Sequence, residues 1–336
     1  MRTISVVIPF YQCETGVLGR ALRSIEAQDI PAGWRLLVVI VDDGSPLPAK
    51  REIADFELTE PRYLKVVEQQ NAGVGSARNR GLDIATPESD AIAFLDSDDI
   101  WPAGHVRRAI EALDAGFDFY FTDNWRAGVH ESHIRSPHVA RTAVLIDRVD
   151  EKSGIIELPH DEIVGLCLLE FPCQASTIVY RKTVAPLLRF NTSIESSGED
   201  VLFFTELLAR CRRVGFDLES SVECGDGVNI YFKNLGWDTP RFLSIITDQL
   251  IIYRLLAQAQ FLSPINRNLS YERIESLTDQ LSYHFIRNLI KNPGKAIQQV
   301  WRLCRIDFGA AVMVLSRTPK SAIMKLSGHL FPVKAD

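Results

Sequence analysis

The sequence lacks an apolar run long enough to cross a membrane. A spanning helix needs roughly 18 uninterrupted apolar residues or more, and the best candidate, Leu250–Leu262, contains Arg254 and two glutamines. The apolar segment at the N-terminus is too short for a signal peptide, and Pro9 interrupts it. We therefore expect a cytoplasmic protein without a membrane-spanning segment.

Paired cysteines are also missing. The six cysteines are scattered without a CxxC pair, which argues against a zinc site or a disulfide framework and fits a reducing compartment. The composition, 46% hydrophobic and 24% charged, is that of a folded globular protein and not of a disordered chain. The cysteines are Cys13, Cys167, Cys173, Cys211, Cys224 and Cys304.

No glycine-rich phosphate loop is present. The segment PFYQCETG after the first apolar run contains no GxGxxG, and no GxxxxGK[ST] occurs in the chain. These absences disfavour a dinucleotide-dependent dehydrogenase and a P-loop ATPase. They also disfavour a sugar-nucleotide pyrophosphorylase, for which we would expect a glycine-rich, basic nucleotide loop after the first strand.

The charge is divided unevenly along the chain. Nine Lys and Arg face one acid, Asp307, between Arg287 and Lys334, so that segment carries +8 and the remainder −14 of the net −6. An acidic main body makes nucleic acid an improbable partner. A basic C-terminal segment suits an anionic membrane surface; a helical cap that packs on its own core or on a second subunit is an equal alternative.

The first half alternates apolar strands with amphipathic helices. A helix over residues 16–28, capped by Thr15, follows the first strand, and this βαβα order predicts a doubly wound, mostly parallel sheet. Its binding crevice is expected at the carboxyl ends of the strands. The expected strands are Ile4–Ile8, Leu36–Val41, Tyr63–Val67 and Ala91–Leu95.

The chain divides into three predicted regions. Residues 1–115 form a nucleotide-binding half and residues 116–235 an acceptor half of one domain. Residues 236–336 are almost entirely helical in pattern and form a C-terminal extension.

A cluster of acids follows the fourth strand in AIAFLDSDDIW. Residues two apart in an extended stretch point the same way, so Asp96 and Asp98 can converge on one point. Carboxylate oxygens of this kind suit Mg²⁺ or Mn²⁺, which retain open positions for substrate phosphates. The alternative is a solvated turn in which Ser97 or Asp99 caps a helix.

Five segments in order resemble the signatures of family 2 glycosyltransferases with the GT-A fold, over roughly residues 4–215. The similarity extends to the glucosyltransferases that build succinoglycan-type bacterial exopolysaccharides. The segments are SVVIPFYQCETGVLGRALRSIEAQ, VIVDDGS, NAGVGSARNRGL, AFLDSDDIW and GEDVLF.

The resemblance implies a UDP-sugar site. Tyr11 would stack on the base, and Asp42 or, preferably, Asp43 would accept a hydrogen bond from uracil N3. Asp98, supported by Asp96, would bind Mn²⁺ or Mg²⁺, which neutralises the diphosphate leaving group. The further nucleotide-sugar-binding candidates are Pro9, Glu14, Asn71, Gly73, Arg78, Asp96 and Ser97.

The resemblance also implies a catalytic pair, Glu199 and Asp200. Asp200 is the candidate general base that takes a proton from the acceptor hydroxyl, in a single displacement that inverts the anomeric configuration. The alternative is two acids stabilised by the dipole at a helix N-terminus. The histidines His130, His133 and His138 have no tight metal spacing and are expected at the surface or in a lid.

Neither a QxxRW-like motif nor membrane-spanning helices of the processive synthases occur in the sequence. We therefore expect transfer of one sugar, with UDP-glucose as donor and a lipid-pyrophosphate-linked oligosaccharide as acceptor, on the inner face of the cytoplasmic membrane. A homodimer is an open alternative for the C-terminal extension. A catalytically silent binding subunit of a membrane polysaccharide complex is the competing function.

Overall fold

The protein is described by a computed structural model over residues 1–54, 56–129, 131–147, 154–225, 236 and 239–326. Its internal contacts divide it into two compact units, which are described separately. The first unit is Met1–Thr192 with Asp200–Asn229, and the second is Ser193–Glu199 with Ile230–Asp336. The predicted domain boundary between residues 235 and 236 adjoins residues 226–235, which lie outside the described ranges, and it stays a prediction.

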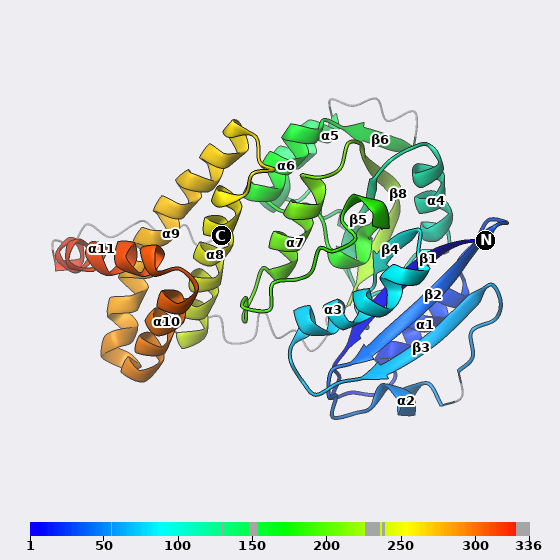
Figure 1. Ribbon diagram of the computed structural model, residues 1–336, viewed down its shortest axis with the longest axis horizontal. Coiled ribbons are helices and arrows are strands. Elements are labelled where there is room, and N and C mark those ends of the chain that lie inside the picture. The colour runs from blue at the N-terminus through cyan, green and yellow to red at the C-terminus, as the bar shows by residue number, and fades with distance from the viewer. Residues whose placement is uncertain (55, 130, 148–153, 226–235, 237–238, 327–336) are drawn as a thin grey trace. The chain divides into compact units, whose positions relative to one another are not determined.

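One sheet of eight strands organises the first unit, in the order β3-β2-β1-β4-β7-β5-β8-β6 (Figure 1). The four strands β3, β2, β1 and β4 are parallel, as is the β5–β8 pair, whereas β7 is antiparallel to β4 and β5, and β6 to β8. The predicted doubly wound α/β sheet with flanking helices is confirmed. The strands are β1 Arg2–Phe10, β2 Trp34–Asp42, β3 Arg62–Glu68, β4 Ala91–Phe94, β5 Phe119–Arg126, β6 Ile155–Leu158, β7 Ile178–Arg181 and β8 Val214–Cys224.

Helices cover both faces of this sheet. Helices α1 (Val17–Glu26) and α4 (His105–Asp114) bury their apolar sides against one face in a single core cluster. On the other face, α3 (Val74–Ala85) approaches β1 so closely that a Cβ on Gly81 would lie 2.3 Å from Val7 Cγ1. The remaining helices of this unit are α2 Ala49–Glu52, α5 Ala140–Asp147, α6 His160–Leu169 and α7 Glu199–Leu208, whose first residue belongs to the second unit.

The start of α1 corrects the predicted Thr15 cap. Gly16 is the capping residue, with a φ of 85°, and it has no side chain that could accept a hydrogen bond. The carboxylate of Glu52 in α2 takes this role, since it accepts hydrogen bonds from the amides of Gly16 (3.2 Å) and Leu18 (3.1 Å). An acid near a helix N-terminus satisfies orphan amides and the dipole together. A distant residue thus replaces the local cap.

Parallel strands bring their carboxyl ends to one edge of the sheet. Strands β1, β2 and β4 are in parallel register, so the residues after each of them meet at that edge. Tyr11, Asp43 and the Asp96–Asp99 loop follow these three strands directly. Because β5 and β8 run in the same direction, their ends lie along the same edge.

Four helices make up nearly all of the described residues of the second unit after position 235, and they confirm the predicted helical C-terminal region. A buried ion pair joins two of them: Arg302 on α10 binds Asp248 on α8, whose side chain is 0% exposed. Within the described ranges, no helix combines the length and the apolar character that crossing a bilayer requires. The helices are α8 Pro240–Gln258, α9 Pro264–Lys291, α10 Pro293–Ile306 and α11 Phe308–Leu326.

Candidate active site

The two acids of the DDGSP turn have different partners. Asp42 Oδ1 accepts the Ser45 amide at 2.8 Å and Oδ2 the Ala49 amide at 2.7 Å, so this carboxylate holds the turn and the start of α2. It is 3% exposed, and both its oxygens have partners within the turn. Asp42 therefore holds the turn in place, and its part in nucleotide binding stays a prediction.

Asp43 shapes the next loop. Its Oδ1 accepts hydrogen bonds from the Gln69 side chain (2.8 Å) and the Ala72 amide (2.9 Å), and its Oδ2 accepts one from the Gly73 amide (2.8 Å). Gly73 has a φ of 90°, a value that glycine adopts without strain. An ionised carboxylate offers about four lone pairs, so Asp43 can position this loop and still accept from a ligand.

The other residues predicted to bind the nucleotide sugar differ in their exposure to solvent. Tyr11 is 37% exposed at the end of β1, as a residue that stacks on a base must be, and Glu14 and Asn71 are exposed as well. Pro9 is buried within β1, opposite Val41 of β2. Pro9 is thus a buried residue of the strand, whereas Tyr11, Glu14 and Asn71 lie at the protein surface.

A serine from a distant segment organises the aspartate loop. Ser176, in the short turn η4 (Ala175–Thr177), accepts the Asp96 amide at 2.9 Å and donates to Asp99 Oδ2 at 2.5 Å. Asp99 Oδ1 also accepts the Gly225 amide at 2.9 Å. Burial raises the pKa of Asp99 well above its ordinary value, and the charges of Asp96 and Asp98 raise it further. Asp99 is consequently a structural acid of the loop and does not cap α4, which begins after Gly104.

Two further contacts hold the loop in place. Gln12, buried after β1, donates from Nε2 to Ser97 Oγ at 3.1 Å. Gly225 lies against Asp98 so closely that an added Cβ would be 2.4 Å from its carbonyl oxygen and 2.7 Å from its Oδ2. Only glycine fits at position 225, and the position of Asp98 depends on this contact.

Arg78 joins the aspartate loop to α7. Its side chain is 5% exposed, donates to Asp96 Oδ1 at 2.9 Å and lies over the Phe190 ring at 5.3 Å. Desolvation raises the pKa of Asp200, Arg78 opposes that rise, and Asp96 adds to it. The structure therefore pairs Arg78 with Asp96, and the charges of both act on Asp200, which comes from a third segment of the sequence.

Some predicted residues are not placed at this site. Glu199 belongs to the second unit and is not placed relative to the aspartate loop. His130 lies outside the described residues, as does the side chain of His138. His133 is half-buried, and its amide bonds to the Asn124 carbonyl at 2.9 Å.

Sequence reasoning missed Gln12, Ser176 and Gly225. Ser176 sits in ASTIVY, which is typical of a strand, and Gly225 follows a strand without a recognisable motif. Their roles depend on contacts with residues 77 to 126 positions away. A single sequence carries no local signal for such contacts.

The metal prediction can be tested against the donor set. Among the described residues, no group of three or more His, Cys, Asp and Glu side chains is arranged to hold a metal ion. Asp99 is committed to hydrogen bonds, and Asp96 is partly exposed at 35% while paired with Arg78. One or two carboxylates, completed by substrate phosphates and water, are the usual protein contribution to a Mg²⁺-type site. Asp98 and Asp96 fit that pattern.

Comparisons with known proteins identify the family of the chain. Residues 5–163 match the family model described as Glycosyl transferase family 2. The chain is 33% identical over 246 residues, 72% of its own length and 75% of the relative's, to the succinoglycan biosynthesis protein ExoW of Rhizobium meliloti.

Solved structures of low sequence identity share the fold. The S. aureus TarS 1–349 complex with UDP-GlcNAc superposes with a TM-score of 0.59 at 15% identity, covering 98% of this chain and 92% of that one. The mannosyltransferase PcManGT from Pyrobaculum calidifontis, in complex with GDP-Man and Mn²⁺, gives 0.55 at 16% identity, with 97% and 82% covered. At these identities the likeness establishes the GT-A fold alone.

Proposed function

The chain belongs to glycosyl transferase family 2, and on this premise we propose that it transfers one sugar from a UDP-linked donor to a saccharide acceptor with inversion. The observation that carries the proposal is the ion pair of Arg78 with Asp96 at the carboxyl edge of the sheet, whose two charges both act on Asp200. The ExoW relative is named for succinoglycan biosynthesis. That name supports a role in exopolysaccharide synthesis. We propose UDP-glucose as the donor and a lipid-linked oligosaccharide of exopolysaccharide, capsule or lipopolysaccharide synthesis as the acceptor.

Asp200 is the proposed general base. Desolvation raises its pKa, which makes the ionised carboxylate a stronger proton acceptor than an exposed aspartate. It takes the proton of the acceptor hydroxyl while that oxygen bonds to the anomeric carbon. The bond from that carbon to the diphosphate oxygen breaks, and its electron pair leaves with UDP. A single displacement of this kind converts an α-linked donor into a β-linked product.

Asp98 and Asp96 are the proposed ligands of Mn²⁺ or Mg²⁺. The cation would supply charge neutralisation for the diphosphate. The chain's own contribution is to hold the two carboxylates still: Ser176 binds the Asp96 amide, and Gly225 packs against Asp98. Arg78 shares the Asp96 carboxylate, so it balances part of the negative charge of the loop from within the fold.

The donor and metal roles can be tested by thermal stability. UDP at about 100 times its dissociation constant should add about 2.7 kcal/mol to the free energy of unfolding. We expect this stabilisation to need Mn²⁺, to disappear in EDTA and to be lost in Asp98→Asn. Asp114→Asn, which alters an exposed carboxylate paired with Arg2, is the matched control. UDP stabilisation that survives EDTA unchanged would contradict the metal role.

We further propose that the second unit docks on an anionic membrane. Apolar side chains are exposed at one-turn spacing on α10, at Ile297 and Trp301, and on α11, at Phe308, Val312 and Leu315. Lys295 and Arg305 are exposed on α10 as well. The only acid from Lys291 to Leu326, Asp307, is paired with Arg254 at 2.6 Å. Exposed indole and aliphatic groups beside basic residues are typical of helices that lie in a membrane interface.

Sedimentation with vesicles checks this docking surface. The protein should bind phosphatidylglycerol vesicles and not phosphatidylcholine vesicles, because each basic residue near an anionic surface adds about 1 kcal/mol. Trp301→Ala should weaken binding about tenfold, whereas Leu187→Ala, a change at an apolar residue 86% exposed in the first unit, should leave it unchanged. Equal binding to both lipids, or a concentration-dependent dimer in place of vesicle binding, would refute the membrane proposal.

A further inference from the structure

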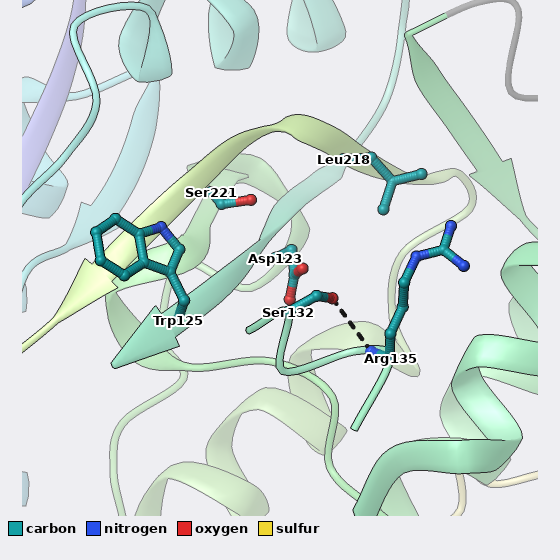
Figure 2. Close-up of a pocket in the computed structure, with 6 residues that line it drawn as sticks. All are labelled: Asp123, Trp125, Ser132, Arg135, Leu218 and Ser221. Carbon is teal, nitrogen blue, oxygen red and sulfur yellow. Dashed lines mark hydrogen bonds between the residues drawn. The ribbon is translucent and has the colours of Figure 1, made fainter. Parts of the chain in front are cut away.

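A pocket of about 480 Å³ opens at the ends of β5 and β8, away from the donor-side residues described above. Its volume lies within the roughly 300–1,000 Å³ typical of small-molecule sites. Figure 2 shows the side chains around it, drawn from both strands and from the segment after β5. The lining residues are Asp123, Trp125, Ser132, Arg135, Leu218 and Ser221.

The pocket has a specific structural origin. The β5–β8 register shifts between Thr122, opposite Asp217, and Asn124, opposite Val222, so one residue on β5 faces four on β8. Such an irregularity interrupts the hydrogen bonds between the strands and changes the direction of the side chains beside it. Phe121, next before Asp123 on the same side of β5, still packs on Phe216 with ring centroids 4.9 Å apart. The apolar core thus ends at Phe121, and the pocket begins at Asp123.

Asp123 is the residue that points to a ligand. It is 3% exposed, and its Oδ1 accepts the amides of Asn124 (2.8 Å) and Ile134 (3.0 Å). Its second oxygen, Oδ2, accepts no hydrogen bond from the part of the chain that the structure describes. This oxygen is not among the fully buried polar atoms without a partner, so it faces the open pocket. A carboxylate oxygen held in place by its neighbour's two hydrogen bonds can accept a hydrogen bond from a donor group of a bound molecule.

The rest of the lining indicates the kind of molecule. Trp125 and Leu218 offer apolar surface, while Ser132 and Ser221 offer hydroxyls that both donate and accept. Arg135 adds a guanidinium, paired with Asp147 at 3.2 Å. A sugar ring carries an apolar C–H face and a rim of hydroxyls, so an indole beside an accepting carboxylate complements it.

The strand pairing relates the pocket to the aspartate loop. Trp125 pairs with Glu223 on β8, and Glu223 forms an isolated bridge with Ile100, the residue after Asp99. Paired strands lie about 4.8 Å apart, and two such spacings separate Trp125 from Ile100. The Trp125 backbone is therefore about 10 Å from the end of the loop. An oligosaccharide spans that distance. A sugar held on Trp125 can therefore belong to a chain whose next unit reaches the aspartates.

We propose that this pocket binds a sugar ring of the saccharide acceptor, with Asp123 accepting from a ring hydroxyl and Trp125 stacking on the C–H face. This inference rests on the proposed transferase function and deepens it. It assigns acceptor recognition to Asp123 and Trp125, neither of which has a part in the donor site.

Saturation-transfer NMR of the full chain with cellobiose and lactose as probes tests the pocket. The wild-type protein and Trp125→Phe should transfer saturation to ring C–H protons, and Trp125→Ala should bind about tenfold more weakly. Asp123→Asn, which turns an acceptor oxygen into a donor, should weaken binding as well while keeping the shape of the side chain. Tyr63→Ala, at a partly exposed aromatic on the edge strand β3, is the matched control with unchanged binding.

UDP-induced stabilisation, recorded on the same samples, separates this inference from the proposed function. The proposal predicts that Trp125→Ala and Asp123→Asn bind UDP as the wild type does. Undiminished saccharide binding by Trp125→Ala and Asp123→Asn would overturn it, as would wild-type protein that binds UDP and neither disaccharide. Loss of both UDP and saccharide binding in the wild type would overturn the transferase function together with it. Should Trp125→Ala fail to fold, Asp123→Asn carries the comparison.

Discussion

Replacing Asp200 by asparagine should lower the rate of sugar transfer by about 10²–10⁴-fold, the usual contribution of a general base. Asparagine keeps the size of the side chain and its acceptor oxygen toward the Val201 amide, which Asp200 Oδ1 binds at 2.7 Å. It cannot take a proton from a hydroxyl. The effect should appear in kcat, measured as UDP release with a saccharide acceptor, while UDP-induced stabilisation stays intact.

The chain offers a close control for this variant. Asp161 is the second residue of α6, as Asp200 is of α7, and both helices have ten residues. Asp161→Asn likewise removes an acid from the first turn of a helix, where its interaction with the helix dipole contributes about 0.3–1 kcal/mol to stability. The Asp161 side chain is 72% exposed. The transfer rate of this variant should equal that of the wild type. Equal rates in Asp200→Asn and Asp161→Asn would mean that Asp200 serves only its helix.

The same assay addresses the competing function. A catalytically silent binding subunit would bind UDP and form no product in the wild type, so Asp200→Asn would change nothing measurable. A pyrophosphorylase would instead release the nucleoside diphosphate sugar from a sugar phosphate and a nucleoside triphosphate. Membership of glycosyl transferase family 2 leaves that reaction without support.

Arg302→Met should destabilise the second unit by about 3–5 kcal/mol, because it leaves a buried carboxylate without its partner. The Asp248 side chain is 0% exposed, and burial raises its pKa even with Arg302 beside it. The Ser196 amide, at 2.6 Å from Oδ2, also binds this carboxylate, but a neutral amide does not replace the charge of Arg302. Hydrogen exchange of the α8 and α10 amides during urea unfolding would measure the loss.

Two further variants test the mechanism of this loss. Arg302→Met combined with Asp248→Leu removes both charges and should recover most of the stability. Arg317→Met breaks a pair with Asp279 whose side chains are 29% and 54% exposed, and it should cost at most about 1 kcal/mol. A cost in Arg302→Met no larger than in Arg317→Met would contradict the importance of burial.

The effect of Arg302→Met should also depend on pH. Without Arg302, the pKa of Asp248 in the folded state rises further above that of the unfolded chain. The folded variant then binds more protons than the unfolded one, so its free energy of unfolding decreases as the pH increases. The destabilisation relative to wild type should therefore be larger at alkaline than at mildly acidic pH.

Local patterns predicted the parallel part of the fold because each element there depends on its own residues. Leu36–Val41 is apolar on both faces, and a strand buried on both sides requires that. The prediction of the helix cap was wrong because a residue distant in sequence provides it. Glu52, and not Thr15, accepts the hydrogen bonds of the amides at the start of α1. The reason is that a cap needs only an acceptor at the right place, wherever in the sequence it lies.

By itself, the sequence determined that acids follow the strands of a doubly wound sheet, because the positions of these acids relative to apolar runs are local facts. The tertiary structure decided how each acid is used. Asp42 and Asp99 are occupied by hydrogen bonds within the fold. Asp96 is paired with Arg78, whose charge also acts on Asp200, and Asp123 keeps one oxygen for the β5–β8 pocket. Burial and partners from distant segments set the role of a carboxylate, and these arise only when the chain is folded.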